Sequence, residues 1–414
     1  MKEQGVKEKR SSASPRVRGW CPGAWRPMAT GDGLLVRVRP PLGRLTRARM
    51  LSLCEAAETW GNGLIEQTRR ANLQLRGVSE AGWPELMAFL VEHGLAAPDA
   101  EGERRPALLL APDWREGDAT HEAARLLERR LADWPALPDK WGLALDAGPA
   151  PVLRDVPADL RLERSREGGL LVRADGREWG TPVADVEAAV ELMTRLAHWF
   201  VDAGGLAAGR MRRLTAPLPG WAAADTEPAA APQASDAASG LTPGPHPAGR
   251  VVGLPFGRAT AASLRAAMCD EAITGVRVTP WRRLLLEGEG ANSNMKDGAP
   301  DDGLIHDARD PRLAMDACPG APFCAQASVA THGLAQSLAE RRSEGPGESA
   351  AGRLHVSGCA KGCARSGPAE VCLTGRDGRY DLILGGRADD TPVATGLGES
   401  DAIEYWETRD ALRL

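Results

Sequence analysis

The sequence predicts an α+β protein that consists of two similar halves, because groups of residues repeat along it. The stretch Gly43-Arg44-Leu45-Thr46 recurs as Gly257-Arg258-Ala259-Thr260, and each threonine is placed to cap a helix. Further on, the interval Thr68–Gly77 recurs as Thr279–Gly288. An offset of 211 to 214 residues therefore holds across the repeated unit, which indicates an internal duplication.

Each half is expected to begin with a small strand-helix-strand unit. In the first half, residues 34–39 alternate as a strand does, a helix follows Thr46, and residues 73–77 alternate again. A larger mixed domain follows in each half. There, Asp175-Gly176-Arg177 and Asp377-Gly378-Arg379 lie between apolar segments as hairpin turns, a geometry that Asp-Gly favours.

Composition gives the expected boundaries. The N-terminal residues are basic and polar, which predicts a disordered tail. Ala, Pro, Gly and Asp dominate from Trp221 to Gly249, so this stretch buries too little apolar surface to offset ordering entropy and is expected to be a linker. The expected order is a tail (1–18), a first half-unit (19–80), a first larger domain (81–215), a linker (216–249), a second half-unit (250–290) and a second larger domain (291–414).

The bulk composition argues against two classes of partner. Apolar residues at 43% and charged residues at 26% are typical of a globular enzyme, and the net charge of −5 gives no reason to expect nucleic acid or an anionic membrane. The first residues lack an apolar signal core, and the longest apolar run, Ala107–Ala111, is far too short to span a membrane. We therefore expect a cytoplasmic protein that binds any anionic ligand through a local basic patch.

Four of the eight cysteines form two closely spaced pairs. Five residues separate Cys318 from Cys324, and three separate Cys359 from Cys363. Two such pairs let two loops close around a [4Fe-4S] cluster, whose irons each take a thiolate. Glycines beside the cysteines let the backbone approach the inorganic core without a Cβ clash.

Structural zinc and disulfides are the alternatives for these pairs. Zinc sites usually have two to four residues between paired ligands, so the wider gap argues against zinc. Disulfides are less favoured still, because nothing marks the chain as secreted. Of the other cysteines, Cys54, Cys269 and Cys372 lie in apolar sequence and are expected to be buried packing residues, while Cys21 has no assigned role.

Arginines gather on one face of the first half-unit. Period two places Arg37 and Arg39 on one face of the first strand, with valines on the other, and Arg70 lies at the entrance of the second strand. A solvated face would explain them. So would a polycarboxylate site, because guanidinium groups bind carboxylates in a bidentate way. The equivalent place in the second half-unit also holds arginines: Arg277, Arg282 and Arg283.

Together these features resemble the siroheme-dependent nitrite and sulfite reductase superfamily and, within it, the precorrin-3B synthase family. The resemblance covers the chain from about Gly19 to the C-terminus, without the linker. It depends on the cysteine pairs and on these motifs: Thr68-Arg69-Arg70-Ala71-Asn72-Leu73-Gln74, a Thr-x-Arg-x-x-x-Gln signature; Leu137-Pro138-Asp139-Lys140-Trp141; and, for the synthase branch, Cys21-Pro22-Gly23 and Ser357-Gly358-Cys359-Ala360-Lys361-Gly362-Cys363.

The resemblance implies an internally duplicated, nitrite/sulfite reductase-like fold. In it the two half-units join into one ferredoxin-like domain, and two larger α+β domains flank that domain. The implied cluster ligands are Cys318, Cys324, Cys359 and Cys363. The implied substrate-binding residues are Arg37, Arg39, Arg70, Gln74 and Lys140, of which Arg37, Arg39 and Lys140 are also the implied catalytic residues.

Two departures from the reductases are informative. Reductases usually carry a second lysine where this chain has Gly142, and an asparagine where it has Lys361. A small oxyanion depends on converging positive charge, so the loss of one cation weakens the case for sulfite or nitrite as substrate. A siroheme-dependent sulfite or nitrite reductase, with siroheme as cofactor, remains the alternative, followed by an iron-sulfur electron-transfer protein.

The resemblance implies an oxidoreductase that hydroxylates precorrin-3A with O2 and forms a γ-lactone in aerobic cobalamin biosynthesis. NADH would be the indirect electron source, and the chain lacks a dinucleotide-binding motif, so we expect an electron-donating reductase partner. The family also implies a mononuclear non-haem iron. The nearest candidate ligands are His306 with Asp307, His332 and His355, each of which would alone be an ordinary surface or core residue.

Overall fold

The computed structural model describes residues 20–149, 151–223, 225–230, 241–289, 302–343 and 353–411. The expected tail at residues 1–18 lies outside them. The chain forms two compact units. The large unit contains Trp20–Ala29 and Gly33–Ala308, and the small unit contains Thr30–Asp32 and Arg309–Leu414.

Two sheets of five described strands are built from the two half-units, and each includes a strand from the other half. The first is, in spatial order, β1 (Met28–Thr30), β2 (Gly33–Val38), β5 (Leu73–Val78), β4 (Leu64–Gln67) and β14 (Arg258–Thr260). The second is β12 (Gly244–His246), β13 (Gly249–Gly253), β16 (Arg283–Glu287), β15 (Gly275–Val278) and β3 (Arg44–Thr46). Because β14 pairs with β4 and β3 pairs with β15, neither half-unit completes its sheet alone.

Local backbone details repeat between the half-units. The side chain of Thr46 accepts a hydrogen bond from the backbone of its helix, and Thr260 does the same in the second half. Before each cap, Leu42 (φ 51°) and Phe256 (φ 54°) adopt the same left-handed conformation. The elements concerned are η1 (Pro41–Gly43), α1 (Arg47–Thr59), η5 (Pro255–Gly257) and α8 (Ala261–Ala267). The predicted duplication of the half-units is confirmed.

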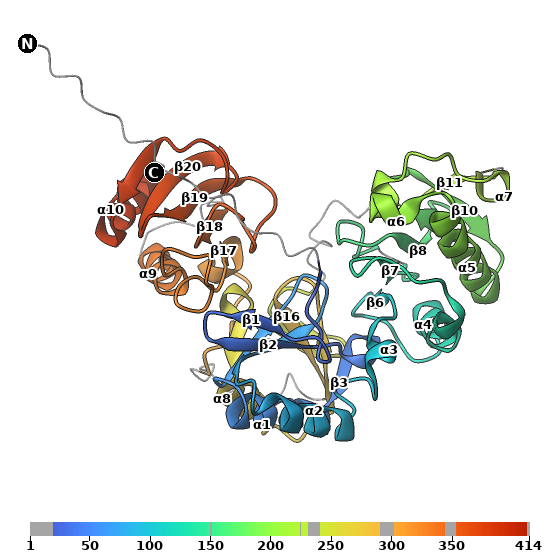
Figure 1. Cartoon of the computed structure of the whole chain (residues 1–414), viewed down its shortest axis with the longest axis horizontal. Coiled ribbons are helices and arrows are strands. Elements are labelled where there is room, and N and C mark those ends of the chain that lie inside the picture. The colour runs from blue at the N-terminus through green and yellow to red at the C-terminus, as the bar shows by residue number, and fades with distance from the viewer. Residues whose placement is uncertain are drawn as a thin grey trace, which may run out of the picture. The chain divides into compact units, whose positions relative to one another are not determined.

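One hydrophobic core serves both half-units. Met50 and Leu53 of α1, Leu264 of α8 and Leu86 of α2 (Trp83–Glu92) are among its fully buried side chains. Figure 1 shows α1, α2 and α8 together on one side of the sheets that contain β2 and β16. This packing fixes the strands that carry the arginines.

The remainder of the large unit contains a third sheet with a separate core around Trp141 and Phe200. Its spatial order is β11 (Glu227–Pro228), β10 (Trp179–Val183), β9 (Leu170–Ala174), β8 (Leu160–Arg164), β7 (Gly142–Leu145) and β6 (Ala107–Leu110). Helices α4 (Ala119–Arg130) and α5 (Val186–Asp202) pack against each other and on this sheet. The short elements are α3 (Ala100–Glu103), η2 (Leu131–Asp133), α6 (Gly205–Ala208), η3 (Met211–Arg213) and α7 (Gly220–Ala223).

The small unit repeats the topology of that third sheet. Its strands are, in order, β17 (Met315–Ala317), β18 (Leu354–Ser357), β19 (Ala369–Arg376), β20 (Arg379–Gly386) and β21 (Ala394–Leu397). As in β6 to β10, the first three are parallel and the last two antiparallel. The other elements are η6 (Pro311–Ala314), α9 (His332–Ser343) and α10 (Glu399–Ala411). The predicted fold class, a duplicated α+β protein, is confirmed.

One of the repeats used to predict the duplication is wrong. Asp175-Gly176 and Asp377-Gly378 both lie in hairpin turns, as expected. However, the first joins β9 to β10, whereas the second joins β19 to β20, the counterparts of β8 and β9. Asp377 (φ 50°) and Gly378 (φ 77°) are both left-handed and form a two-residue turn, whereas of Asp175 and Gly176 only Gly176 (φ 84°) is left-handed. The dipeptide indicates a turn and not a common origin.

Ordered elements also lie within the stretch 216–249, which composition predicts to be a linker. Helix α7 lies there, β11 pairs with β10, and β12 pairs with β13. An edge strand needs only the backbone hydrogen bonds of one neighbour, so a segment with few apolar residues can still form one. The other predicted boundaries stay predictions. None of the described helices is long and apolar enough to cross a membrane.

Candidate functional site

The two cysteine pairs start at one edge of the sheet in the small unit. Strands β17 and β18 are parallel neighbours, with Ala317 opposite Val356. Cys318 directly follows β17, and Cys359 follows β18 after one intervening residue. Because the carboxyl ends of parallel strands meet at the same edge of a sheet, the two loops start side by side.

The four thiols share one neighbourhood. Burial raises the pKa of the Cys363 thiol to about 11, Lys361 opposes this, and the thiolates of the other three cysteines raise the pKa further. The backbone N–H of Gly358 donates a hydrogen bond to Cys318 Sγ at 3.1 Å. Cys318 is buried, whereas Cys363 is exposed as a residue although the surrounding loops still desolvate its thiol. A bound cationic iron centre would favour the thiolate form and so counteract these raised pKa values.

The two cysteine loops pack closely against each other at their glycines. A Cβ on Gly358 would lie 2.6 Å from the Cβ of Ala327 and 3.2 Å from the Cα of Gly320, so the two loops approach backbone to backbone. Within the described residues, no three His, Cys, Asp or Glu side chains gather as ligands of a single ion. Cysteines that each take a different iron of a cluster do not have to converge in that way. The donor set therefore fits a [4Fe-4S] cluster.

The remaining cysteines and histidines differ from expectation in part. Cys54 and Cys372 are buried as predicted, but Cys269 is exposed, so its prediction as a packing residue is wrong. Cys269 lies just after α8 ends, beyond the face that this helix buries. The Nε2 atom of His306 contacts the two carboxylate oxygens of Asp302 at 2.9 and 3.1 Å.

The candidate histidines for a mononuclear iron are not assembled into a site. His355 is fully buried, and its Nδ1 lies 3.5 Å from Cys372 Sγ. His332 is the first residue of α9. Within neither unit do three potential ligands gather in the described parts of the chain, so these residues form no iron site inside one unit, and we derive no chemistry from such an iron.

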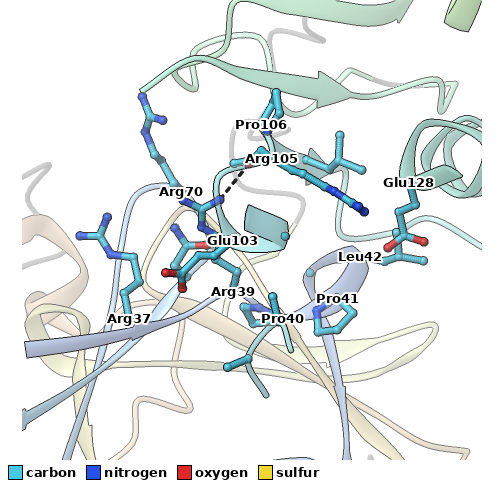
Figure 2. A pocket seen from close by; sticks show the side chains of 18 of the residues that line it. Arg37, Arg39, Pro40, Pro41, Leu42, Arg70, Glu103, Arg105, Pro106 and Glu128 are labelled. Atoms are coloured by element: carbon cyan, nitrogen blue, oxygen red, sulfur yellow. Dashed lines mark hydrogen bonds between the residues drawn. The ribbon is translucent and has the colours of Figure 1, made fainter. Parts of the chain in front are cut away.

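A cavity of about 430 Å³ in the large unit brings together three of the predicted arginines, Arg37, Arg39 and Arg70 (Figure 2). Arg105 and Glu103 also line it, although no sequence pattern predicts them as site residues. Glu103 is the last residue of α3 and Arg105 lies in the link from α3 to β6, a segment without periodicity or motif. Only a structure that folds this link over the end of β2 can identify them.

The Thr-x-Arg-x-x-x-Gln motif forms the turn that presents Arg70. The hydroxyl oxygen of Thr68 accepts hydrogen bonds from the backbone N–H groups of Arg70 (3.3 Å) and Asn72 (3.2 Å). Between them, Ala71 is left-handed, with φ 52°. The glutamine of the motif, Gln74, then lies in β5. The spacing of the motif is thus the spacing of one turn and the start of one strand.

Gln74 orients Arg37. The two residues lie directly opposite each other in β5 and β2, and the Nε and Nη2 atoms of Arg37 donate to Gln74 Oε1 at 3.1 and 2.7 Å. The amide of Gln74 donates in turn to Glu66, which also pairs with the buried Arg76. This network fixes one side of the Arg37 guanidinium. Arg76 is therefore structural and does not belong to a binding face.

The pocket carries excess positive charge. Burial is the main cause of the lowered pKa of Arg70; neighbouring Arg210 lowers it as well, and Cys21 and Asp159 act in the opposite direction. Arginine nevertheless stays charged at neutral pH. Among the described residues, the Arg70 side chain has no hydrogen bond or ion pair, so its donors can take an anion. Arg39 is less available, since its Nη1 donates to the carbonyl oxygen of Arg105 at 3.0 Å.

The structure does not bring Lys140 into this pocket. Its side chain is exposed and is not among those that line the cavity. The N–H of Trp141 donates to the carbonyl of Pro138, and the buried Trp141 ring packs against Trp134 and Phe200. Packing of this tryptophan sets the direction of the turn and leaves the lysine outside.

The arginines of the second half-unit have other roles. Arg277 is buried, forms an ion pair with Glu287 and stacks on Trp114. Arg283 donates to the carbonyl oxygen of Leu241 at 3.0 Å. These two arginines therefore do not form a second open basic face, because partners from other parts of the sequence bind them.

Comparisons with known proteins identify the family of this chain. A model of the nitrite/sulfite reductase ferredoxin-like half domain matches residues 26–93. A precorrin-3B synthase from a Sinorhizobium species is 32% identical over 424 residues, which cover 92% of this chain and 87% of that protein. This chain belongs to the precorrin-3B synthase family. The protein is therefore an oxidoreductase-type enzyme, as the sequence predicts.

A solved structure supports the fold of this family member. The NirA protein of Mycobacterium tuberculosis aligns with a TM-score of 0.59 over 90% of this chain and 79% of its own. The identity is 18%, so this likeness concerns the fold alone. It agrees with the duplicated arrangement of half-units and larger sheets described above.

Proposed function

We propose that the protein hydroxylates precorrin-3A with O2 and closes a γ-lactone from an acetate side chain, a step of aerobic cobalamin biosynthesis. The observation that carries this proposal is the similarity to a precorrin-3B synthase, which is 32% identical over 92% of this chain. The arginine pocket of the large unit supports it, because a precorrin is a tetrapyrrole with many carboxylates.

Three arginines of the pocket would bind these carboxylates. Gln74 holds Arg37 in one orientation, and the carbonyl of Arg105 holds Arg39, so both are ordered before a ligand arrives. Arg70 offers a guanidinium with no partner among the described residues. A charge-assisted pair of this kind contributes about 1.5 to 3 kcal/mol. Lys140 has no place in this proposal, because it is exposed outside the cavity.

The four paired cysteines would hold a [4Fe-4S] cluster. When bound, such a cluster supplies electrons one at a time. The residues themselves stabilise the ionised ligand: the N–H of Gly358 points at Cys318 Sγ, and Lys361 lowers the pKa of Cys363. Gly320 (φ 67°) and Gly362 (φ 60°) provide left-handed turns that other residues rarely adopt.

The reaction requires an electron donor. One oxygen atom of O2 enters the product and the other leaves as water, which consumes two electrons and two protons from outside the substrate. We propose NADH as their indirect source, with a reductase as the partner that delivers them, because the chain has no dinucleotide-binding motif.

The structure of β7 argues against sulfite or nitrite as substrate. Gly142, where reductases carry a lysine, is buried, and its N–H donates to Asp159 Oδ2 at 3.0 Å. A Cβ there would lie 3.1 Å from the carbonyl oxygen of Ala107. This position supplies no cation, and a small oxyanion needs several converging ones.

Anaerobic purification from a siroheme-producing host tests the proposal. We expect cluster iron and sulfide without stoichiometric siroheme, and consumption of precorrin-3A only when O2 and a reductant are both present. A siroheme absorption spectrum together with sulfite-dependent oxidation of a reduced dye would contradict the proposal and favour the reductase alternative.

A further inference from the structure

Glu103 is an unusual member of the arginine pocket, because its carboxylate pairs with no arginine among the described residues. Both of its oxygens accept hydrogen bonds from backbone N–H groups instead: Oε1 from Ala24 at 2.6 Å and Oε2 from Trp25 at 2.9 Å. Figure 2 shows Glu103 among the side chains that line the cavity. A carboxylate that could neutralise the pocket is thus used to hold a segment of backbone.

That segment, Trp20–Arg26, is called the strap below. Besides Glu103, two indole groups fix it: Trp25 Nε1 donates to the carbonyl of Ala97 at 2.8 Å, and Trp83 Nε1 donates to the carbonyl of Ala24 at 3.1 Å. Ala97 itself lines the pocket. The strap is therefore attached to the rim of the cavity by both main-chain and side-chain bonds.

The strap in turn contacts Arg37. The carbonyl of Gly23 accepts a hydrogen bond from the backbone N–H of Arg37 at 3.1 Å. Burial lowers the pKa of the Arg37 guanidinium, and the nearby Cys21 of the strap opposes this effect. Arg37 is thus held by Gln74 through its side chain and by the strap through its backbone, so displacement of the strap would loosen the backbone from which the guanidinium extends.

We propose that Glu103 is a positioning residue for carboxylate binding: it clamps the strap, and the strap fixes Arg37 in the pocket. This inference rests on the proposed binding of the precorrin's carboxylates by the arginines. It assigns a role to the motif around Cys21, which the cluster does not use. Gly23 belongs to the same clamp, because a Cβ there would lie 2.3 Å from Glu103 Oε2.

The direction in which Glu103→Gln changes the affinity for a polycarboxylate distinguishes this role from a simple charge effect. If Glu103 acted only as a negative charge, Glu103→Gln would strengthen the binding of a polycarboxylate, because it removes repulsion. If Glu103 is a clamp, the same change weakens binding, because the amide group of glutamine meets an N–H donor of the strap and one hydrogen bond is lost. Glu101→Gln is the matched control, since Glu101 is an exposed residue of the same short helix and does not line the cavity.

The experiment uses the full-length protein and uroporphyrin III, a tetrapyrrole with a carboxylate on every side chain, as the probe. We expect Glu103→Gln to weaken its affinity about three- to tenfold, which is the effect of losing one ordinary hydrogen bond. Glu101→Gln leaves the affinity unchanged. Gly23→Ala reproduces the effect of Glu103→Gln without a change of charge, and the double variant is no weaker than either single variant.

Alkylation of Cys21 by iodoacetamide reports on the strap itself, with the exposed Cys269 as the internal reference. We expect Glu103→Gln and Gly23→Ala to increase the rate at Cys21 several-fold relative to Cys269, while thermal unfolding stays cooperative. Equal or tighter probe binding by Glu103→Gln, or unchanged alkylation of Cys21, would overturn the inference. Failure of the unaltered protein to bind the probe would instead contradict the proposed carboxylate site.

Discussion

The two half-units have the same backbone but opposite chemistry at equivalent positions. In the first, Arg37 of β2 lies directly opposite Gln74 of β5. In the second, Val251 of β13 lies directly opposite Leu285 of β16, at the offsets that the repeat predicts. Where one copy has an arginine held by an amide, the other has two apolar side chains.

In the second half-unit, apolar side chains fill the place that corresponds to the arginine pocket. Val251 and Leu285 are buried with Leu241, and Trp281, which stands at the offset of Arg70, packs against them. The counterpart of the arginine pocket is thus filled by side chains. Duplication preserved the turn and the strand pairing, and the site depends on which side chains the first copy places on them.

Both half-units also contain a buried ion pair at equivalent positions, but the acidic and basic residues have changed places. Glu66 and Arg76 pair across β4 and β5 of the first half-unit. At the same offset, Arg277 and Glu287 pair across β15 and β16 of the second. Both copies need a buried pair at this place, although the order of the charges is reversed. The pair therefore belongs to the fold and not to the site.

In the two larger sheets it is the second copy, and not the first, that carries the predicted site residues. Cysteines follow β17 and β18 in the small unit, whereas Ala111 and Asp146 follow the counterparts β6 and β7 in the large unit. The first copy thus contributes the arginines and the second the cysteines. Each copy retained the scaffold and specialised a different part of it.

The largest effect should come from the cysteines that only the second copy carries. Cys359→Ser removes a ligand from the proposed cluster, so we expect it to lose most of its iron and sulfide, measured after anaerobic purification. Cys372→Ser is the control, because Cys372 is buried in β19 away from the paired loops. Full iron in Cys359→Ser with loss in Cys372→Ser would refute the assignment.

The buried ion pairs should matter for stability in both copies. Glu287→Ala leaves Arg277 and Arg44, which both contact this carboxylate, without their partner. Breaking a buried pair in this way costs about 3 to 5 kcal/mol in the free energy of unfolding. We expect a similar cost from Arg76→Ala in the first half-unit, measured by urea unfolding. A cost in only one half-unit would show that the pairs are not equivalent.

Arg70 and Trp281 test whether binding belongs to one copy. Arg70→Ala removes an unpaired cation of the pocket, so we expect about tenfold weaker binding of precorrin-3A with stability nearly unchanged. Trp281→Ala opens the apolar cluster and should lower the free energy of unfolding by about 2 to 4 kcal/mol without a change in affinity. Isothermal titration and urea unfolding of both variants check this, and unaltered affinity in Arg70→Ala would refute its role.

The sequence allows prediction of features that depend on local spacing. The helix caps at Thr46 and Thr260 and the alternation around Arg37 each involve a few neighbouring residues, so the periods of helices and strands predict them. The paired cysteines can be recognised from their short spacing, and Arg70 is identified through its family motif.

Features that depend on distant partners could not be predicted in this way. The burial of Arg277 depends on Glu287 and on Trp114, which precedes it by more than a hundred residues in the chain. Arg105 enters the pocket through a link without a motif. Lys140 has the motif but not the location, because the packing of its neighbour Trp141 sets the direction of the turn. In each case tertiary contacts decide the environment of a side chain.

The smallest effect concerns Asp146. It directly follows β7 of the large unit, and the equivalent position after β18 of the small unit begins the loop that carries Cys359. Its Oδ2 accepts hydrogen bonds from the N–H groups of Val152 and Leu153, both at 2.7 Å, and its buried Oδ1 has no partner in the described residues. Burial raises the pKa of Asp146 from 3.8 to about 6. The carboxyl thus closes a loop that, in the other copy, holds thiols.

Because the folded protein holds this proton more tightly than the unfolded chain, protonation of Asp146 stabilises the fold. That contribution is fully present below about pH 4 and is lost as the pH rises through about 6. We expect Asp146→Asn, which stays neutral, to lose this pH dependence and to exceed the unaltered protein by about 1 to 3 kcal/mol at high pH. Urea unfolding at pH 5 and pH 8 measures it, with exposed Asp133→Asn as the control, and an unchanged pH profile would show that the loop is not held by a buried, protonated carboxyl.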